Sequence, residues 1–312
     1  MWPTRPSRTV KSLLPEGFRV RDALPSDLDA AEDIVRAEES SFRDANAEPA
    51  DLADFWRNAN FDGASWMVER NGATVGFAAA IERDAESAYW ATVRPEIAAL
   101  GVSSWLLTRA EQRAREAGSN IIRAGCLAGN AAADPLFRRL GYREARHYFQ
   151  MRIDFEQAPA PSSTPGGVEI TPFRREDARL FHEALNAAFS EEWGWHATSF
   201  EEWRERRLES SDTDVSLWFI ARAGEDIAGV VRCERRRDGG GWIGALGVLE
   251  PWRRRGVGRA LLFHAFSEFH RRGASHVGLG VDAENPTGAT RLYEGAGMRV
   301  VREDVIYEKE LR

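Results

Sequence analysis

The sequence predicts an α+β protein in which one unit occurs twice in tandem, each copy being a mixed, mostly antiparallel sheet flanked by helices. Residues 156–167 are rich in proline, serine and glycine, a composition typical of linkers. The same order of features appears on both sides of this segment. Trp66 corresponds to Trp218 and Gly141 to Gly297, and the spacing grows only from 152 to 156 residues. Short loop insertions produce such a drift, so we expect two copies of one fold.

The predicted boundaries place an N-terminal tail at 1–16, a first domain at 17–155, the linker at 156–167 and a second domain at 168–312. A chain of 312 residues is long enough for two domains of ordinary size. Within each copy the pattern predicts a strand, helices, a run of antiparallel strands and a loop that opens a helix. A strand, a helix and closing strands then complete the copy.

The composition excludes several classes of protein. The net charge is −7, which argues against a nucleic-acid partner despite the arginine clusters. No segment has the length of a membrane span, and the start lacks the apolar core of a signal peptide. Cys126 and Cys233 form no disulfide framework, and the histidines form no metal-binding motif. We therefore expect a cytoplasmic protein that binds no membrane and no metal; the oligomeric state stays open.

A strongly basic segment follows the predicted strand Trp242–Val248. Between Glu250 and Arg259 it carries four arginines and one glutamate, and Gly256-Val257-Gly258 opens an amphipathic helix. The unpaired amides at a helix start and the positive end of the helix dipole bind anions. Glycine lets a bulky anion approach the backbone, and arginine matches phosphate oxygens. The segment therefore predicts a pyrophosphate site; the alternative is a solvated, arginine-rich helix start.

Two common phosphate-binding loops are excluded by single positions. A Walker loop needs a lysine after its last glycine, but the only lysines are Lys11 and Lys309. A dinucleotide-binding fingerprint needs Gly or Ala three residues after the second glycine, where this chain has Leu261. The loop therefore belongs to another kind of site.

A second pattern follows the basic segment. Residues 276–281 are typical of a short strand, Asn285-Pro286 suits the start of a helix, and that helix runs over Thr287–Glu294. Glycines at 295 and 297 are expected to end it. Two strands rich in β-branched residues should follow, at Met298–Arg302 and Val305–Leu311.

These two patterns, Arg-Arg-Arg-Gly-Val-Gly at 253–258 and then Asn, Leu-Tyr-Glu and Gly-Met in order, resemble the signatures of the GCN5-related N-acetyltransferase (GNAT) family. They cover about residues 242–311, and the tandem layout is similar to that of mycothiol synthase. The resemblance implies direct transfer of an acetyl group from the co-substrate acetyl-CoA to an amine within a ternary complex. The acceptor is expected to be a small molecule, which the sequence does not identify. A non-catalytic acyl-CoA-binding sensor or scaffold is the alternative.

The resemblance also implies roles for individual residues. Asn285 either contacts CoA or only caps its helix. Tyr293 is the expected general acid for the departing thiolate, and the alternative is a core aromatic. Gly244 and Gly247 fit a bulge or a close ligand. Backbone groups of the strand before the loop should hold the pantetheine and thioester, and the loop should hold the pyrophosphate; these cofactor-binding positions are Leu246, Val248, Arg253, Arg254, Arg255, Gly256, Val257, Gly258 and Arg259.

The group that takes the amine proton is not apparent from the sequence. An alkyl amine has a pKa of ~10.4, so it is charged at neutral pH. No Asp, Glu or His lies between Gly239 and Leu249. Glu234, on the predicted strand 227–234, is the nearest candidate, with a solvent-facing role or a water chain as alternatives. The connection Glu191–His196 is expected to border the acceptor, or else to pack against the next helix.

The first copy departs from both signatures. Its loop, Arg94–Ser103, carries no net charge and lacks both the first arginine and the second glycine of the later loop. Phe137 takes the position of Tyr293 and has no proton to give. We therefore expect catalysis only in the second domain, with the first as a degenerate structural partner.

Overall fold

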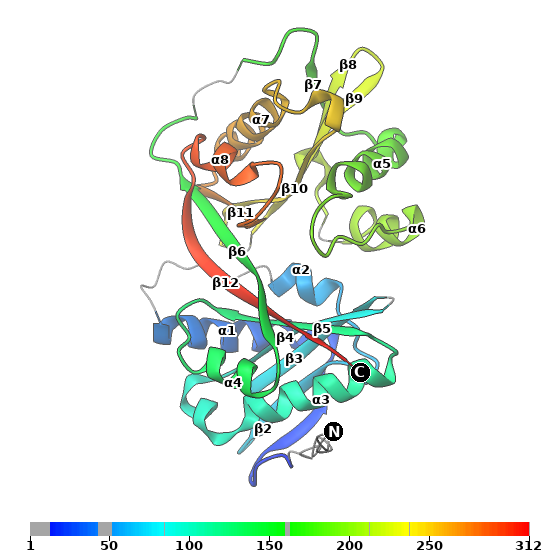
Figure 1. The fold of residues 1–312 in the computed structure, drawn as a ribbon. Coiled ribbons are helices and arrows are strands. Elements are labelled where there is room, and N and C mark those ends of the chain that lie inside the picture. Colours follow the sequence, from blue (N-terminus) through cyan, green and yellow to red (C-terminus); the bar gives the residue numbers. More distant parts are fainter. Residues whose placement is uncertain are drawn as a thin grey trace, which may run out of the picture. The chain divides into compact units, whose positions relative to one another are not determined.

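The computed structural model describes residues 13–42, 52–83, 85–159, 163–211, 213–236 and 238–311. The chain forms two compact units (Figure 1). Unit 1 consists of the chain up to His147 together with the segment from Asp304 onward, and unit 2 consists of Tyr148–Glu303. Parts of the expected tail (1–12) and of the expected linker (160–162) lie outside the described residues.

Unit 1 is a mixed sheet with its strands in the order β1-β2-β3-β4-β5-β12. All neighbouring pairs are antiparallel except β4 and β5, which are parallel. The strands are β1 (Arg19–Asp22), β2 (Trp66–Arg70), β3 (Ala73–Arg83), β4 (Glu86–Val93), β5 (Ile121–Leu127) and β12 (Arg299–Glu310). The helices are α1 (Leu28–Phe42), α2 (Leu52–Arg57), α3 (Val102–Glu116) and α4 (Ala133–Arg139).

Unit 2 repeats this arrangement with the strand order β6-β11-β10-β9-β8-β7, and β10 and β11 are its parallel pair. The strands are β6 (Arg143–Asp154), β7 (Glu169–Pro172), β8 (Phe219–Ala223), β9 (Asp226–Arg235), β10 (Gly241–Val248) and β11 (His276–Asp282). The helices are α5 (Ala178–Phe189), α6 (Phe200–Trp203), α7 (Val257–Arg271) and α8 (Ala289–Glu294). In Figure 1 the sheet of this unit runs between α7 and α8 on one side and α5 and α6 on the other.

Aromatic side chains fill the core of unit 2. Phe181 of α5 stacks on Trp218 with 5.4 Å between the ring centroids. Phe266 and Phe269 of α7 are fully buried, because the apolar residues of this helix recur at helical spacing and share one face. Burial of these rings holds α5 and α7 against β9 and β10, and both helices have one end at the candidate site described below.

The closing strands of the two copies are exchanged between the units. Residues Tyr148–Asp154 of β6 pair antiparallel with β11, within unit 2. Residues Asp304–Glu310 of β12 pair antiparallel with β5, within unit 1. Met151 accordingly belongs to the core of unit 2, and Tyr307 belongs to the core of unit 1. Each sheet is therefore completed by a strand from the other copy of the sequence.

Because of this exchange, the two units differ from the contiguous domains that the sequence predicted at 17–155 and 168–312. Residues 148–154 lie with unit 2 and residues 304–311 with unit 1. The physical reason is that an alternating strand sequence specifies a pleated, half-buried segment, but it does not specify which open sheet edge that segment joins.

Two sequence-based expectations near the C-terminus are corrected. The two strands expected at 298–302 and 305–311 are one strand, β12. Glu303 and Asp304, which fall between the two expected strands, lie inside β12 where it passes from unit 2 to unit 1. The helix expected from Thr287 begins at Ala289, because Gly288 adopts a left-handed conformation at its start. Asn285 is therefore not the cap of this helix.

Among the described residues, no helix is both long and apolar enough to cross a membrane.

Candidate functional site

The sheet of unit 2 opens between β10 and β11. The two strands pair in parallel only from Gly241 to Ile243. At the next residue, Gly244, the register between β10 and β9 shifts, which is a β-bulge. A Cβ at Gly244 would lie 2.7 Å from the Arg232 guanidinium, so a larger residue there would displace that side chain. Among the described pairings, residues 245–248 of β10 have no partner in β11, and this stretch of backbone edge is available to a ligand.

The basic loop places two positive φ angles beside the start of a long helix. Arg254 has φ +59°, and Gly256, at the N-cap of the 15-residue helix α7, has φ +87°. Backbone conformations that alternate in this way turn successive amides toward one point and form a concave anion site. The first amides of α7 add to it, because they have no partner within the helix. Local backbone geometry therefore supports the predicted pyrophosphate site.

The four arginines of the loop have different surroundings. The guanidinium of Arg253 donates to the carbonyls of Val248 and Ala188, each at 3.2 Å, and to the Glu191 carboxylate at 2.7 Å. It thereby ties the end of α5 to the end of β10. Arg259 donates to a backbone carbonyl at 3.2 Å. The remaining two, Arg254 and Arg255, are exposed.

Gly258 brings the first turn of α7 close to β10 and α8. A Cβ at this position would lie 3.3 Å from Leu292 and 3.4 Å from Val248, with Leu246 slightly farther away. Val257, in contrast, is fully buried. Leu246 and Val248, which are expected to bind pantetheine, thus pack their side chains against the loop. Their backbone lies in the part of β10 that does not pair with β11.

Tyr293 lies on α8 and is 7% exposed. Burial raises the pKa of its hydroxyl well above the ordinary value, and the negative charge of Glu192 raises that pKa further. The phenol therefore keeps its proton at neutral pH, as a general acid must before it acts. Tyr293 also belongs to the hydrophobic core of unit 2, so both of its expected roles are compatible with its position.

Glu192 is a functional candidate that the sequence did not single out. It is half-buried on the connection between α5 and α6, and its Oε1 accepts a hydrogen bond of 2.8 Å from the Asn285 side chain. Burial and the nearby Asp282 carboxylate raise the pKa of Glu192, whereas the bond from Asn285 and the charge of Arg253 lower it. The net shift is upward. The sequence predicts only that the segment 191–196 borders the acceptor.

Glu234 is the residue that the sequence suggested as the catalytic base, and its carboxylate forms an ion pair with Arg232. It lies on β9 opposite Trp242, beside the bulge, and accepts a hydrogen bond from the Arg232 guanidinium. This ion pair turns Glu234 into part of the bulge structure. Asn285, for its part, also accepts from the backbone amide of Thr287 at 2.9 Å, so it stabilises the turn that precedes α8.

Unit 1 has a different structure at each of these places. Between β3 and β4 the pairing continues without a bulge. The loop forms a 3₁₀-helix over Pro95–Leu100, which uses backbone amides for its own hydrogen bonds. Thr92 donates to Glu38 at 2.6 Å. Phe137 stacks on Tyr307 at 4.3 Å. Among its described residues, unit 1 therefore has no bulge between β3 and β4, no arginine with positive φ in its loop, and phenylalanine in place of Tyr293.

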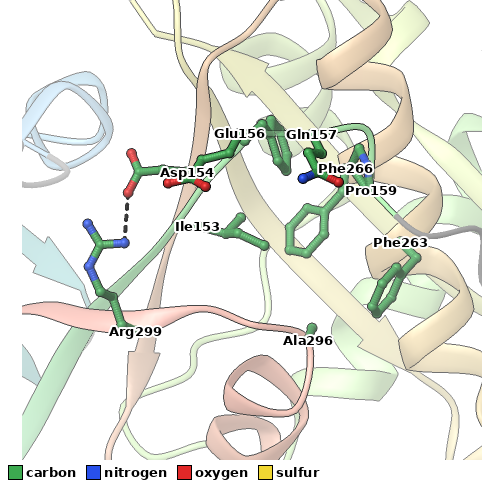
Figure 2. Close-up of a pocket in the computed structure, with 10 residues that line it drawn as sticks. Ile153, Asp154, Glu156, Gln157, Pro159, Phe263, Phe266, Ala296 and Arg299 are labelled. Atoms are coloured by element: carbon green, nitrogen blue, oxygen red, sulfur yellow. Dashed lines mark ion pairs between the residues drawn. The ribbon is translucent and has the colours of Figure 1, made fainter.

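Figure 2 shows a separate cavity of about 790 Å³ within unit 2. Residues of β6, of the segment that follows β6 and of α7 line it, and Asp154 forms an ion pair with Arg299 at its edge. None of the loop residues, Glu192 or Tyr293 lines this cavity. It is therefore distinct from the candidate site.

Two regions of the chain, residues 31–142 and 178–298, match the acetyltransferase (GNAT) family. The chain belongs to this family. The match occurs once in each copy, so the predicted tandem GNAT architecture is confirmed. The family and the α+β fold expected from the two signatures are likewise confirmed.

Several proteins resemble this chain. It is 31% identical over 197 residues to a mycothiol acetyltransferase of Acidothermus cellulolyticus, an alignment that covers 57% of this chain and 59% of that relative. A GCN5-related N-acetyltransferase of Sphaerobacter thermophilus has 28% identity and a TM-score of 0.80, covering 96% of this chain and 98% of that protein. A tandem GNAT protein from the clavulanic acid biosynthesis pathway shares the fold at 15% identity, with a TM-score of 0.70 over 95% of this chain and 99% of that one. The matched part spans less than two thirds of the mycothiol acetyltransferase.

Proposed function

We propose that unit 2 catalyses direct transfer of an acetyl group from acetyl-CoA to the amine of a small molecule. One observation carries the proposal: the unpaired edge of β10 leads directly into an anion-binding loop, and a buried phenol lies on the neighbouring helix α8. This arrangement matches the shape of an acyl-CoA, which has a pyrophosphate at one end and a thioester at the other.

Each part of the site then has a chemical role. Backbone amides at Arg254–Val257 and the exposed guanidinium groups hold the pyrophosphate. Backbone groups of Leu246 and Val248 align the pantetheine, and an amide on this edge polarises the thioester carbonyl. Arg253 acts mainly by fixing the end of β10. The hydroxyl of Tyr293 protonates the thiolate as the carbon–sulfur bond breaks.

A small-molecule amine is the acceptor best supported by the surroundings. The connection between α5 and α6 contributes the Glu192 carboxylate and Trp195, whose ring stacks on Phe189 at 4.9 Å. A carboxylate beside aromatic rings suits a cationic amine. The similarity to mycothiol acetyltransferases supports the same class of acceptor. A cytoplasmic location is part of this proposal, and it fits Cys126 and Cys233, which form no disulfide.

The test is a thiol-release assay with acetyl-CoA and a panel of amines that includes amino sugars, polyamines, aminoglycosides and peptide N-termini. We expect at least one amine to give release above hydrolysis. The Tyr293→Phe variant should lose about 100-fold in kcat and keep its affinity for CoA, because only proton transfer is removed. The matched Phe137→Tyr variant in unit 1 should leave kcat unchanged.

A wild-type protein that binds CoA but acetylates no amine on the panel would favour the sensor alternative. Loss of CoA affinity in Tyr293→Phe would instead assign the tyrosine to binding or packing. Calorimetry with CoA, together with thermal melting, separates these two outcomes from a failure to fold.

A further inference from the structure

The Glu192 carboxylate lies where three segments of unit 2 converge. It stands on the connection after α5, Asn285 reaches it from the turn after β11, and its charge acts on Tyr293 of α8. Asn285 is itself fixed, since its Oδ1 accepts from the amide of Thr287. The carboxylate is therefore held in one orientation, near the phenol assigned to the leaving thiolate.

From this geometry we propose that Glu192 is the catalytic base, which takes the proton of the acceptor amine, and that Asn285 is the positioning residue that orients it. The inference rests on the function proposed above. It replaces Glu234, which Arg232 holds at the bulge. It also predicts that the acceptor is a primary amine that arrives with a positive charge.

The charged groups around Glu192 suit this role. Asp282, at the end of β11, disfavours its ionised form, as does burial, while Arg253 beside the loop and the Asn285 amide favour it. The resulting pKa lies above that of an ordinary glutamate. A raised pKa makes the carboxylate a stronger base for the amine proton. Glu191, on the same connection, pairs with Arg253 and is 62% exposed at its side chain, so it is the less suitable carboxylate.

Internal duplication offers a second, independent observation. In unit 1, the side chain of Asn130 donates to Glu38 at 3.2 Å, a similar bond to that of Asn285 with Glu192, although Glu38 lies within α1 and Glu192 follows the end of α5. There, however, Thr92 donates to the second carboxylate oxygen of Glu38. The equivalent residue of β10 is Gly247, which has no side chain to offer. In unit 2 the second oxygen, Oε2, accepts no hydrogen bond from the described residues, and it is the atom we assign to the amine.

The proton balance is complete with these two groups. The amine arrives as R-NH₃⁺, and Glu192 Oε2 takes one proton, which leaves neutral nitrogen. The nitrogen attacks the thioester carbon, a carbon–nitrogen bond forms, and the carbon–sulfur bond then breaks. The thiolate takes the proton of the Tyr293 hydroxyl, and the resulting phenolate takes the second proton from nitrogen. Glu192 finally releases its proton to solvent, so one proton is released for each amide formed.

The test compares Glu192→Gln with wild-type protein and with Glu38→Gln, the same change in the corresponding pair of unit 1. We expect Glu192→Gln to lose about 100-fold in kcat/KM at neutral pH and to keep its affinity for CoA by calorimetry. The acid limb of the pH profile of kcat/KM, set by Glu192 in the wild type, should disappear. Glu38→Gln should retain both the rate and the limb.

Asn285→Ala tests the positioning role. Loss of its hydrogen bond removes a contact that favours the ionised carboxylate, so the acid limb should move to higher pH while the limb itself remains. Glu192→Asp should keep the limb at a reduced rate, because the shorter side chain retains the base in a poorer position. A purely structural role would change stability in these variants without moving the limb.

Two failures are distinguishable. If wild-type protein acetylates an amine and Glu192→Gln does so at the same rate with the same pH profile, the assignment of Glu192 is overturned and the proposed function stands. If wild-type protein acetylates no amine at all, the proposed function fails, and the inference fails with it.

Discussion

The two units share one framework but differ in the parts that chemistry needs. Both start their long helix after a left-handed glycine, Gly101 in unit 1 and Gly256 in unit 2. Both also retain a hydrogen bond between an asparagine and a glutamate. Unit 2 adds the bulge at Gly244, a positive φ at Arg254 and the phenol of Tyr293. Under the proposed function, the catalytic unit thus differs from the other by a few local changes on a shared scaffold.

The comparison also separates framework from function at single positions. A left-handed glycine at a helix start is present in both units, so it is a requirement of the fold and not a mark of activity. The residue at this position of the strand does distinguish them, because Thr92 donates to Glu38 whereas Gly247 lets Ala188 of α5 approach the strand closely. The following experiments use such matched positions.

The largest expected effect comes from removing residues 304–312. Asp304–Glu310 form the strand that pairs with β5, and Val305 and Tyr307 are buried in the core of unit 1. We therefore expect unit 1 to unfold while unit 2 keeps its fold. Hydrogen exchange followed by mass spectrometry should show loss of protection in β5 and not in β10. Loss confined to unit 2 would contradict the strand exchange.

Gly256→Glu should abolish CoA binding, with a loss of affinity of about 100-fold or more, because a carboxylate would face the pyrophosphate. A non-glycine residue at this φ also costs roughly 1–2 kcal/mol of stability. Gly101→Glu carries the same backbone strain at φ +83° and should bind CoA normally. Calorimetry measures both affinities, and equal losses in the two variants would remove the distinction between the loops.

Gly247→Thr introduces the side chain of unit 1 into unit 2. Its Cβ would lie 2.7 Å from that of Ala188, and such overpacking costs about 1–3 kcal/mol. Gly247→Ala places the same Cβ against Ala188, so it should also lower the Tm, and the larger threonine should lower it further. Thr92→Gly should leave turnover unchanged. Melting curves of the three variants measure the packing effect, and steady-state kinetics shows whether turnover falls with it.

Arg253→Ala should have the smallest effect. It removes three donated hydrogen bonds from a partly buried side chain and should cost about 1–2 kcal/mol. The Tm should then fall by a few degrees. If Arg253 instead held the phosphate directly, CoA affinity would fall in Arg253→Lys as well, with little change in Tm. Calorimetry and thermal melting on both variants distinguish these roles.

The local features of the site could be predicted from the sequence because they depend on neighbouring residues. The glycines at 256 and 258 and the arginines before them specify a loop and a helix start within a few positions. The bulge at Gly244 is another local event, and a glycine inside a strand indicated it. Tyr293 lies on the helix that its own surroundings predicted, although that helix starts two residues later than expected.

Contacts between distant segments could not be predicted in this way. Glu192 and Asn285 are 93 residues apart, and nothing near either residue indicates the other. The hydrogen bond from Arg253 to Glu191 joins residues 62 positions apart. It gives a structural role to a side chain that the sequence predicted to bind the phosphate. The internal repeat does not reveal the pair either, because Glu38 lies within α1 whereas Glu192 follows the end of α5.

The sequence by itself determined the repeated unit, the loop that precedes α7 and the family, because strand and helix periodicity and glycine conformations are properties of short segments. Only the tertiary structure decided that β6 and β12 exchange units and that a carboxylate of the α5–α6 connection meets the amide of Asn285. These outcomes depend on which surfaces and edges are buried together when the chain folds. That choice is made by the free energy of the whole molecule, and no short segment encodes it.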